Sequence, residues 1–164
     1  MDLRGFDEKT LLLAAVKSEI ESKEAYRQIA ESVRNALLKD KLNYLASEEE
    51  KHRAIIEGVF VEKFSAEALA IPDHSPVPLP ELKITDEMMP LTEVFQAAMN
   101  AEKAANDFYN GLASLYDAHS GLKKTIEYVA TMEMGHYRLL EIEKHNMERF
   151  EDFDVYMPSV HLGP

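Results

Sequence analysis

The sequence predicts an all-α protein: a four-helix bundle made of two duplicated antiparallel helical hairpins joined by a long connection. The first observation behind this fold class is a Glu-x-x-His motif that occurs twice, at Glu49–His52 and at Glu133–His136, each time with a tyrosine five residues before the glutamate. The second is a nearly constant spacing between the two copies. The third is a proline-containing segment that separates the two copies.

The duplication extends upstream of the two motifs. Glu19 is followed by Tyr26 and Glu102 by Tyr109, seven residues later in both cases. The offset between the copies is 83 at the upstream glutamates (19 to 102) and 84 at both members of the Glu-x-x-His motif (49 to 133 and 52 to 136). A nearly constant offset over four segments indicates a duplicated helical hairpin.

The spacing within each copy predicts where the chain turns. The midpoint between Glu19 and Glu49 is position 34, and the midpoint between Glu102 and Glu133 falls between positions 117 and 118. If the chain reverses at these points, the two glutamates of a hairpin lie at the same height, about 22 Å from the turn. Two such hairpins packed face to face would bring four carboxylates and two imidazoles to one level of the bundle.

The four helices are expected at about 7–31, 36–64, 90–116 and 122–148. Asp7 is a candidate N-cap, and Pro90 suits the start of a helix. We therefore predict one domain over residues 1–164, with a hairpin at 7–64, a crossover at 65–89, a second hairpin at 90–148 and a C-terminal tail at 149–164.

The predicted crossover contains four prolines, so most of it cannot be helical. They are Pro72, Pro76, Pro78 and Pro80. A connection of this length is unusual in a compact domain, but it is needed if the second and third helices run parallel, because it must then travel the length of the bundle. Two independent hairpin domains would also show such a linker, although each hairpin alone would have too small a core.

The repeated residues have the chemistry of metal ligands. On a helix, positions i and i+3 share a face, so the glutamate and histidine of each motif can contact one ion. Burying one unpaired carboxylate costs several kcal/mol, and four at one level require neutralisation by cations or protons. The predicted metal ligands are Glu19, Glu49, His52, Glu102, Glu133 and His136.

These residues resemble the ligand set of the ferritin-like di-iron carboxylate proteins, and among them the rubrerythrin-like branch. The resemblance covers about residues 7–148 and includes Tyr26 and Tyr109, which are candidates for hydrogen bonds to the ligating carboxylates, although an ordinary core role fits them equally well. It implies two iron ions in the bundle; the spacing alone does not separate iron from manganese or zinc.

The resemblance also implies reaction of the metal centre with peroxide or dioxygen. A rubrerythrin-type peroxidase would here need a separate electron-donor protein, because the chain has no cysteine for an iron–cysteine domain. Peroxidase rubrerythrins carry a further carboxylate three residues after the third-helix glutamate, where this chain has Ala105. The symmetric six-ligand set is closer to the ferroxidase pattern of bacterioferritins. A non-catalytic iron-binding or iron-handling protein and a metal-free helical interaction module remain as alternatives.

Composition excludes other classes of function. The formal charge of −12 argues against nucleic acid or an anionic membrane as a partner, and no signal peptide or membrane span is visible, so we expect a cytoplasmic protein.

The resemblance further implies a homodimer. The histidines outside the motif and the glutamates next to it, including Glu48, are expected at the surface, whereas Tyr44 and Tyr128 are expected to pack.

Overall fold

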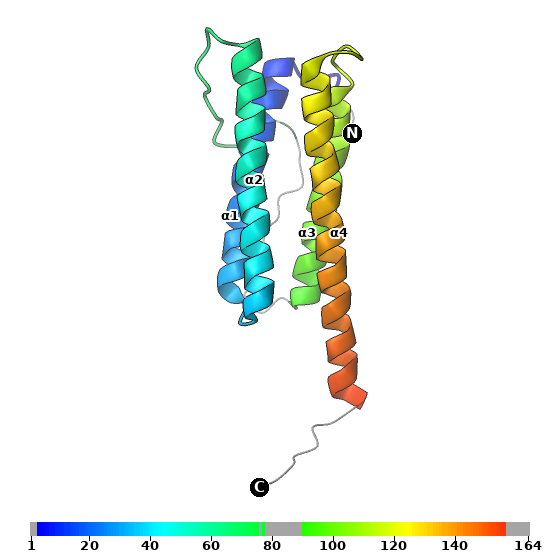
Figure 1. Cartoon of the computed structure of the whole chain (residues 1–164). Helices are drawn as coiled ribbons and strands as arrows, with labels where there is room; N and C mark the ends of the chain where they lie inside the picture. The colour runs from blue at the N-terminus through cyan, green and yellow to red at the C-terminus, as the bar shows by residue number, and fades with distance from the viewer. Residues whose placement is uncertain (1–2, 76, 78–89, 157–164) are drawn as a thin grey trace.

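The computed structural model describes residues 3–75, 77 and 90–156, with side chains up to residue 149. It contains four helices: α1 (Glu8–Ser32), α2 (Ala36–Lys63), α3 (Leu91–Ala113) and α4 (Gly121–Tyr156). They form two long hairpins that lie side by side (Figure 1), and no strand occurs in the described part of the chain. The predicted all-α four-helix fold is confirmed.

Local capping explains where the first two helices begin. The Asp7 carboxylate accepts a hydrogen bond of 2.8 Å from the backbone N–H of Thr10 at the start of α1, and the side-chain oxygen of Asn35 accepts one of 3.1 Å from the N–H of Leu38 at the start of α2. Both bonds satisfy donors that the first turn of a helix leaves unpaired. The turns at 33–35 and 114–120 contain the two predicted midpoints.

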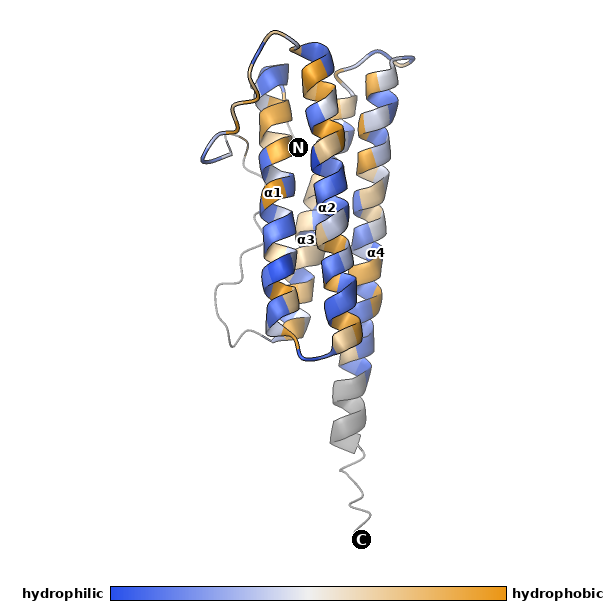
Figure 2. Ribbon diagram, turned by 60° about the vertical axis from the view of Figure 1, so that its left-hand side comes forward, coloured by the Kyte–Doolittle hydropathy of each residue, from blue (hydrophilic) through white to orange (hydrophobic). Residues whose placement is uncertain are grey.

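The hydrophobic core is divided into two clusters, one towards each end of the bundle. One cluster joins the N-terminal halves of α1 and α4 to the C-terminal halves of α2 and α3. The other joins the opposite halves of α1, α2 and α3 to Leu140 of α4. Because the C-terminal halves of α2 and α3 share a cluster, these helices run parallel, as predicted. In Figure 2, hydrophobic and hydrophilic residues alternate along each helix, as expected when one stripe of each is buried.

Contacts within each hairpin, α1 with α2 and α3 with α4, are the most extensive in the bundle, and the two hairpins meet chiefly through α2 and α4. Between the two hydrophobic clusters lies a layer of buried charged side chains. The residues of the predicted crossover that are described, 65–75 and 77, contain no helix; the remainder of the crossover lies outside the described residues.

Three expectations from the sequence are wrong. Helix α4 continues to Tyr156, so the predicted tail at 149–164 begins at least eight residues too early; residues 157–164 lie outside the described part. Glu48 is buried, with 6% of its surface exposed, and it pairs with Lys51 instead of facing solvent. Tyr44 and Tyr128 are about half exposed, at 49% and 55%, and do not pack in the core.

Among the described helices, none is long and apolar enough to cross a membrane.

Candidate metal centre

The buried charged layer is built from one glutamate on each helix and one histidine on each of α2 and α4. All six side chains come from residues that are at most 4% exposed, so they are withdrawn from water at the middle of the bundle. The duplicated spacing explains this convergence, because it places equivalent residues of the two hairpins at one level. The six are Glu19, Glu49, His52, Glu102, Glu133 and His136.

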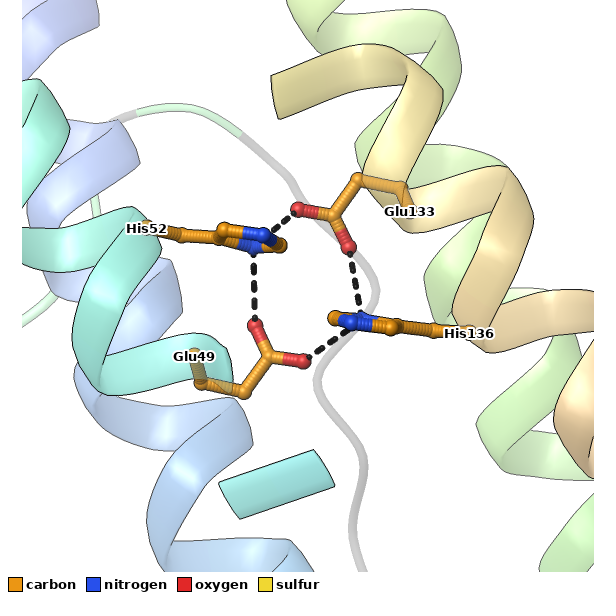
Figure 3. A group of neighbouring side chains, drawn as sticks. All are labelled: Glu49, His52, Glu133 and His136. Carbon is orange, nitrogen blue, oxygen red and sulfur yellow. Dashed lines mark ion pairs between the residues drawn. The ribbon is translucent and has the colours of Figure 1, made fainter. Parts of the chain in front are cut away.

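Four of these residues form an alternating ring across the interface between α2 and α4 (Figure 3). The Nδ1 atom of His52 lies 2.9 Å from a carboxylate oxygen of Glu133 and 3.6 Å from one of Glu49. The Nδ1 atom of His136 lies 3.1 Å from Glu49 and 3.6 Å from Glu133. The two imidazole rings are stacked, with centroids 5.1 Å apart. Glu49 and Glu133 therefore each lie between both histidines.

The remaining two glutamates each approach one histidine. A carboxylate oxygen of Glu19 lies 3.7 Å from the Nδ1 atom of His52, and one of Glu102 lies 3.5 Å from the Nδ1 atom of His136. In both cases the glutamate and the histidine belong to the same hairpin. The six residues thus show an approximate two-fold arrangement, with two shared glutamates at the centre and one unshared glutamate beside each histidine.

Two buried tyrosines link the hairpins at this level. The hydroxyl of Tyr26 on α1 donates a hydrogen bond to Glu102 on α3, and the hydroxyl of Tyr109 on α3 donates one to Glu19 on α1. Burial, followed by the charge of the accepting glutamate, raises the pKa of each tyrosine well above its ordinary value, so both remain neutral donors. Each unshared carboxylate is therefore oriented by the opposite hairpin.

Burial and mutual contacts divide the carboxylates into two kinds. Burial would raise the pKa of Glu49, but its contacts with His136 and His52 outweigh this effect and lower the pKa to about 2. Glu133 contacts the same histidines and also has a lowered pKa, despite its burial and the charge of Glu49. For Glu19 and Glu102, burial and the neighbouring carboxylate charges dominate, so their pKa values are raised well above the ordinary value.

The histidines shift in the opposite direction from that favoured by burial. Burial alone favours the neutral ring, but contacts with Glu133 and Glu49 raise the pKa of His52 to about 9. Contacts with Glu102, Glu133 and Glu49 likewise raise the pKa of His136 well above its ordinary value. At neutral pH two imidazolium groups then balance the carboxylates of Glu49 and Glu133, and the raised pKa values of Glu19 and Glu102 favour the neutral form of both.

The donor set fits a metal site by an independent criterion. In the described part of the chain, the Nε2 atoms of His52 and His136 are buried without a hydrogen-bond partner, whereas the Nδ1 atoms contact only the carboxylates of the cluster. One ligand atom from each of these residues can be chosen so that all four lie within 4.8 Å of one another. Unpartnered buried polar atoms are costly unless something else satisfies them, and carboxylate oxygen with imidazole nitrogen suits divalent iron, manganese or zinc.

A small cavity adjoins the carboxylates on the side of α1 and α3. It is lined by Glu19, Glu49, Glu102 and Glu133 together with Ser18, Ser22, Ala101 and Ala105. The sequence predicts the four glutamates, but it did not single out three of the small residues. Ser18 and Ser22 repeat as Ala101 and Ala105 at the offset of Glu19 and Glu102 (18 to 101, 22 to 105), which is a signal that could have identified them.

The structure brings all six predicted ligand residues together, and places both candidate tyrosines against carboxylates of the set. The described histidines outside the motif, His74, His119 and His145, are exposed, as expected; His161 lies outside the described residues.

Comparison with known proteins agrees with this geometry. The rubrerythrin family model matches residues 10–144. A hypothetical protein from Pyrococcus furiosus has a similar solved structure, with a TM-score of 0.78 and 29% sequence identity over 91% of this chain and 95% of that chain. No curated protein matches the chain significantly. Since the family model covers most of the sequence, and the buried glutamate and histidine cluster fits a di-iron site, the chain belongs to the rubrerythrin family.

Proposed function

We propose that this protein binds two iron ions in the middle of its bundle and uses them as an oxidoreductase that reacts with peroxide or dioxygen. The observation that carries the proposal is the convergence of four buried carboxylates and two buried imidazoles at one level of the bundle. Membership of the rubrerythrin family supports iron over manganese and zinc.

The distances suggest how the ligands would be divided. Glu19 and His52 would hold one ion, Glu102 and His136 the other, and Glu49 and Glu133, which each lie near both histidines, would be shared. When bound, two ferrous ions supply the two electrons that, with two protons, reduce hydrogen peroxide to two water molecules. The tyrosine hydroxyls would fix the orientation of the unshared carboxylates, and the flanking hydrophobic clusters keep bulk water away.

Partners follow from the composition and the proposed reaction. A peroxidase needs a continuous supply of electrons, and with no cysteine in the chain for an iron–cysteine centre, we propose that a separate protein delivers them. A cytoplasmic location and a homodimer remain predictions from the sequence and the family resemblance.

A second candidate is an iron-handling protein without turnover. It is favoured by the pKa shifts of the cluster, because protonated histidines and a raised pKa of Glu19 reduce its net negative charge before metal binds. A site that is electrically balanced without metal can fill and empty without the fold carrying several unpaired buried charges. A metal-free interaction module is a third possibility, which leaves the convergence of six buried ionisable side chains unexplained.

Metal analysis and rapid mixing distinguish these functions. We expect about two iron ions per chain after purification under iron-replete conditions, in line with a six-ligand dinuclear site; less than one would support the metal-free module. The ferrous protein is then mixed with peroxide and, separately, with dioxygen while absorption is followed. Rapid oxidation with repeated turnover when a reductant is present supports the enzyme, whereas a single oxidation followed by retention or release of iron supports iron handling.

A matched pair of adjacent glutamates tests the site itself. We expect Glu49→Gln to lower the metal content substantially, because it removes an anionic oxygen placed between both histidines. Glu48→Gln is the control, since Glu48 is also buried on α2 but pairs with Lys51 rather than with the cluster. Full metal occupancy in Glu49→Gln, measured by elemental analysis, would contradict the assigned role of Glu49.

A further inference from the structure

The cavity beside the carboxylates is bounded on its outer side by four small side chains, Ser18 and Ser22 on α1 and Ala101 and Ala105 on α3. We refer to these four residues as the small-residue opening. Each of them is half-buried and so keeps part of its surface exposed to solvent, whereas the glutamates behind them are almost fully buried. The cavity therefore leads from the buried carboxylates towards the surface between α1 and α3.

Close helix packing does not explain the small side chains. Small residues on facing helices commonly let two backbones approach closely, but α1 packs against α2, α3 packs against α4, and the hairpins meet through α2 and α4. The pair α1 and α3 is not among these closely packed pairs. Serine and alanine at this position thus leave space between the helices instead of filling it.

The duplication places the small residues in a fixed relation to the site. Ser18 and Ser22 lie one residue before and three residues after Glu19, and Ala101 and Ala105 have the same relation to Glu102. Small side chains therefore flank both unshared glutamates on the same helix face, although the residues that surround them in sequence differ between the copies.

The inner end of the cavity is formed by the carboxylates of the candidate metal centre. Glu49 and Glu133 line the cavity, and one oxygen of each lies 3.1 Å and 2.9 Å, respectively, from the Nδ1 atom of a histidine on the other hairpin. Each residue is 1% exposed. The cavity thus joins a route of small side chains to the carboxylates that would hold the metal ions.

We propose that the small-residue opening is the route by which hydrogen peroxide or dioxygen reaches the metal centre, and that its width excludes substituted hydroperoxides. This inference rests on the proposed function. The space open to the centre of a water molecule is about 10 Å³, close to what a single water needs. We expect hydrogen peroxide and dioxygen, each with two heavy atoms, to enter such a space in line, and the branched carbon of tert-butyl hydroperoxide to be too bulky for it.

A graded series at one position tests the route. The variants Ala105→Gly, Ala105→Val and Ala105→Leu widen or narrow the opening in steps. Ala104→Leu is the matched control, because Ala104 is the neighbouring half-buried alanine of α3 and does not line the cavity. Ser22→Val narrows the opening from the α1 side and replaces the leucine variant if that variant fails to fold. Elemental analysis first establishes that each variant holds as much iron as the wild type.

Two readouts are measured on the iron-loaded proteins: the association rate of azide with the oxidised form, followed by absorption, and the rate at which peroxide oxidises the ferrous form. We expect both rates to fall in the order glycine, alanine, valine, leucine, with the leucine variant about tenfold or more below wild type, as for other filled pockets. Ala104→Leu should stay within about twofold of wild type, since its added methylenes lie outside the route. The glycine variant should also reduce the preference for hydrogen peroxide over tert-butyl hydroperoxide.

The outcomes separate this inference from the proposed function. If wild type binds iron and reacts with peroxide, but the substitutions at residues 105 and 22 leave both rates unchanged, the route lies elsewhere and the inference is wrong. Equal rates of wild type with hydrogen peroxide and tert-butyl hydroperoxide would also overturn it. If wild type binds iron and the series changes azide association but no form reacts with peroxide or dioxygen, the route stands and the proposed oxidoreductase function fails.

Discussion

Tyr26 and Tyr109 connect the two hairpins through the carboxylates that the sequence repeats. Each hydroxyl crosses from its own helix to the unshared glutamate of the other hairpin. Because one oxygen of each unshared carboxylate is held by a tyrosine hydroxyl, the carboxylate would lose less orientational freedom if its other oxygen bound a metal ion. Replacing either tyrosine by phenylalanine removes the hydroxyl and keeps the ring in the core.

We therefore expect Tyr26→Phe and Tyr109→Phe each to weaken metal binding by about tenfold, the lower end of the effect seen when partners of metal ligands are removed. The effects should be similar because the two bonds are equivalent in the duplication. Competition with a chelator measures the affinity. Tyr128→Phe is the control, since Tyr128 is about half exposed; an unchanged affinity in both core variants would show that the hydroxyls do not position the carboxylates.

At the residue scale, the sequence predicts the members of the cluster but not all of their surroundings. The six ligand candidates can be found because the duplication repeats them at one spacing. The crossed pairing of the tyrosines depends on how the hairpins face one another, which no local pattern contains. Glu48 was assigned to the surface because it stands in a run of three glutamates, whereas the structure buries it beside Lys51.

The side chains of Asp7 and Asn35 cap the starts of α1 and α2, and their contribution to stability can be tested by substitution. We expect Asp7→Ala and Asn35→Ala each to lower the free energy of unfolding by about 1 kcal/mol, because each leaves a backbone N–H of the first turn without its partner. In a protein of this size the melting temperature should fall by about 2–4 °C, measured calorimetrically.

Neither cap touches the charged layer, so the metal content of both variants should equal that of wild type. Serine at either position provides the control, because its hydroxyl can also accept the N–H bond and should restore most of the stability. A loss of metal in the alanine variants at temperatures well below melting would show that the helix ends and the site are coupled, contrary to this expectation.

At the element scale, helix starts and turns could be predicted because caps and the symmetric placement of the glutamates are local signals. The end of α4 could not. The acidic and aromatic residues after Glu148 were interpreted as an irregular tail, but neither proline nor glycine occurs between Glu148 and Pro158. Without such a residue nothing in the backbone stops the helix, and it continues to Tyr156.

The whole molecule balances its buried charge with protons when metal is absent, and this determines how stability depends on pH. The pKa of His52 is raised from 6.5 to about 9, so its contribution to stability is complete below pH 6.5 and is lost as the pH rises through 9. The raised pKa values of Glu19 and Glu102 act in the same direction above their ordinary value of 4.5.

We therefore expect the metal-free protein to lose stability as the pH increases from 6.5 to about 9, by at most about 3 kcal/mol from His52 alone. Chemical denaturation at several pH values measures this change. The metal-loaded protein should lose much less over the same range, because its histidines are already deprotonated. A metal-free protein whose stability is constant or increases over this interval would contradict the assigned protonation states.

The same charge balance predicts that protons leave when metal enters. At pH 7 the raised pKa values of His52 and His136 keep both rings protonated, and those of Glu19 and Glu102 favour protonation of these carboxylates. Two divalent ions bound by all six side chains would displace the two protons of the imidazolium groups and any proton held by Glu19 and Glu102, and leave the cluster neutral. Calorimetric titration of the metal-free protein with ferrous iron under anaerobic conditions, in buffers of different ionisation enthalpy, counts these protons. The number should fall as the pH rises through about 9, because His52 then loses its proton before metal binds. Release of no protons at pH 7 would mean that the carboxylates and imidazoles are not the groups that bind the metal, even if two ions per chain are found.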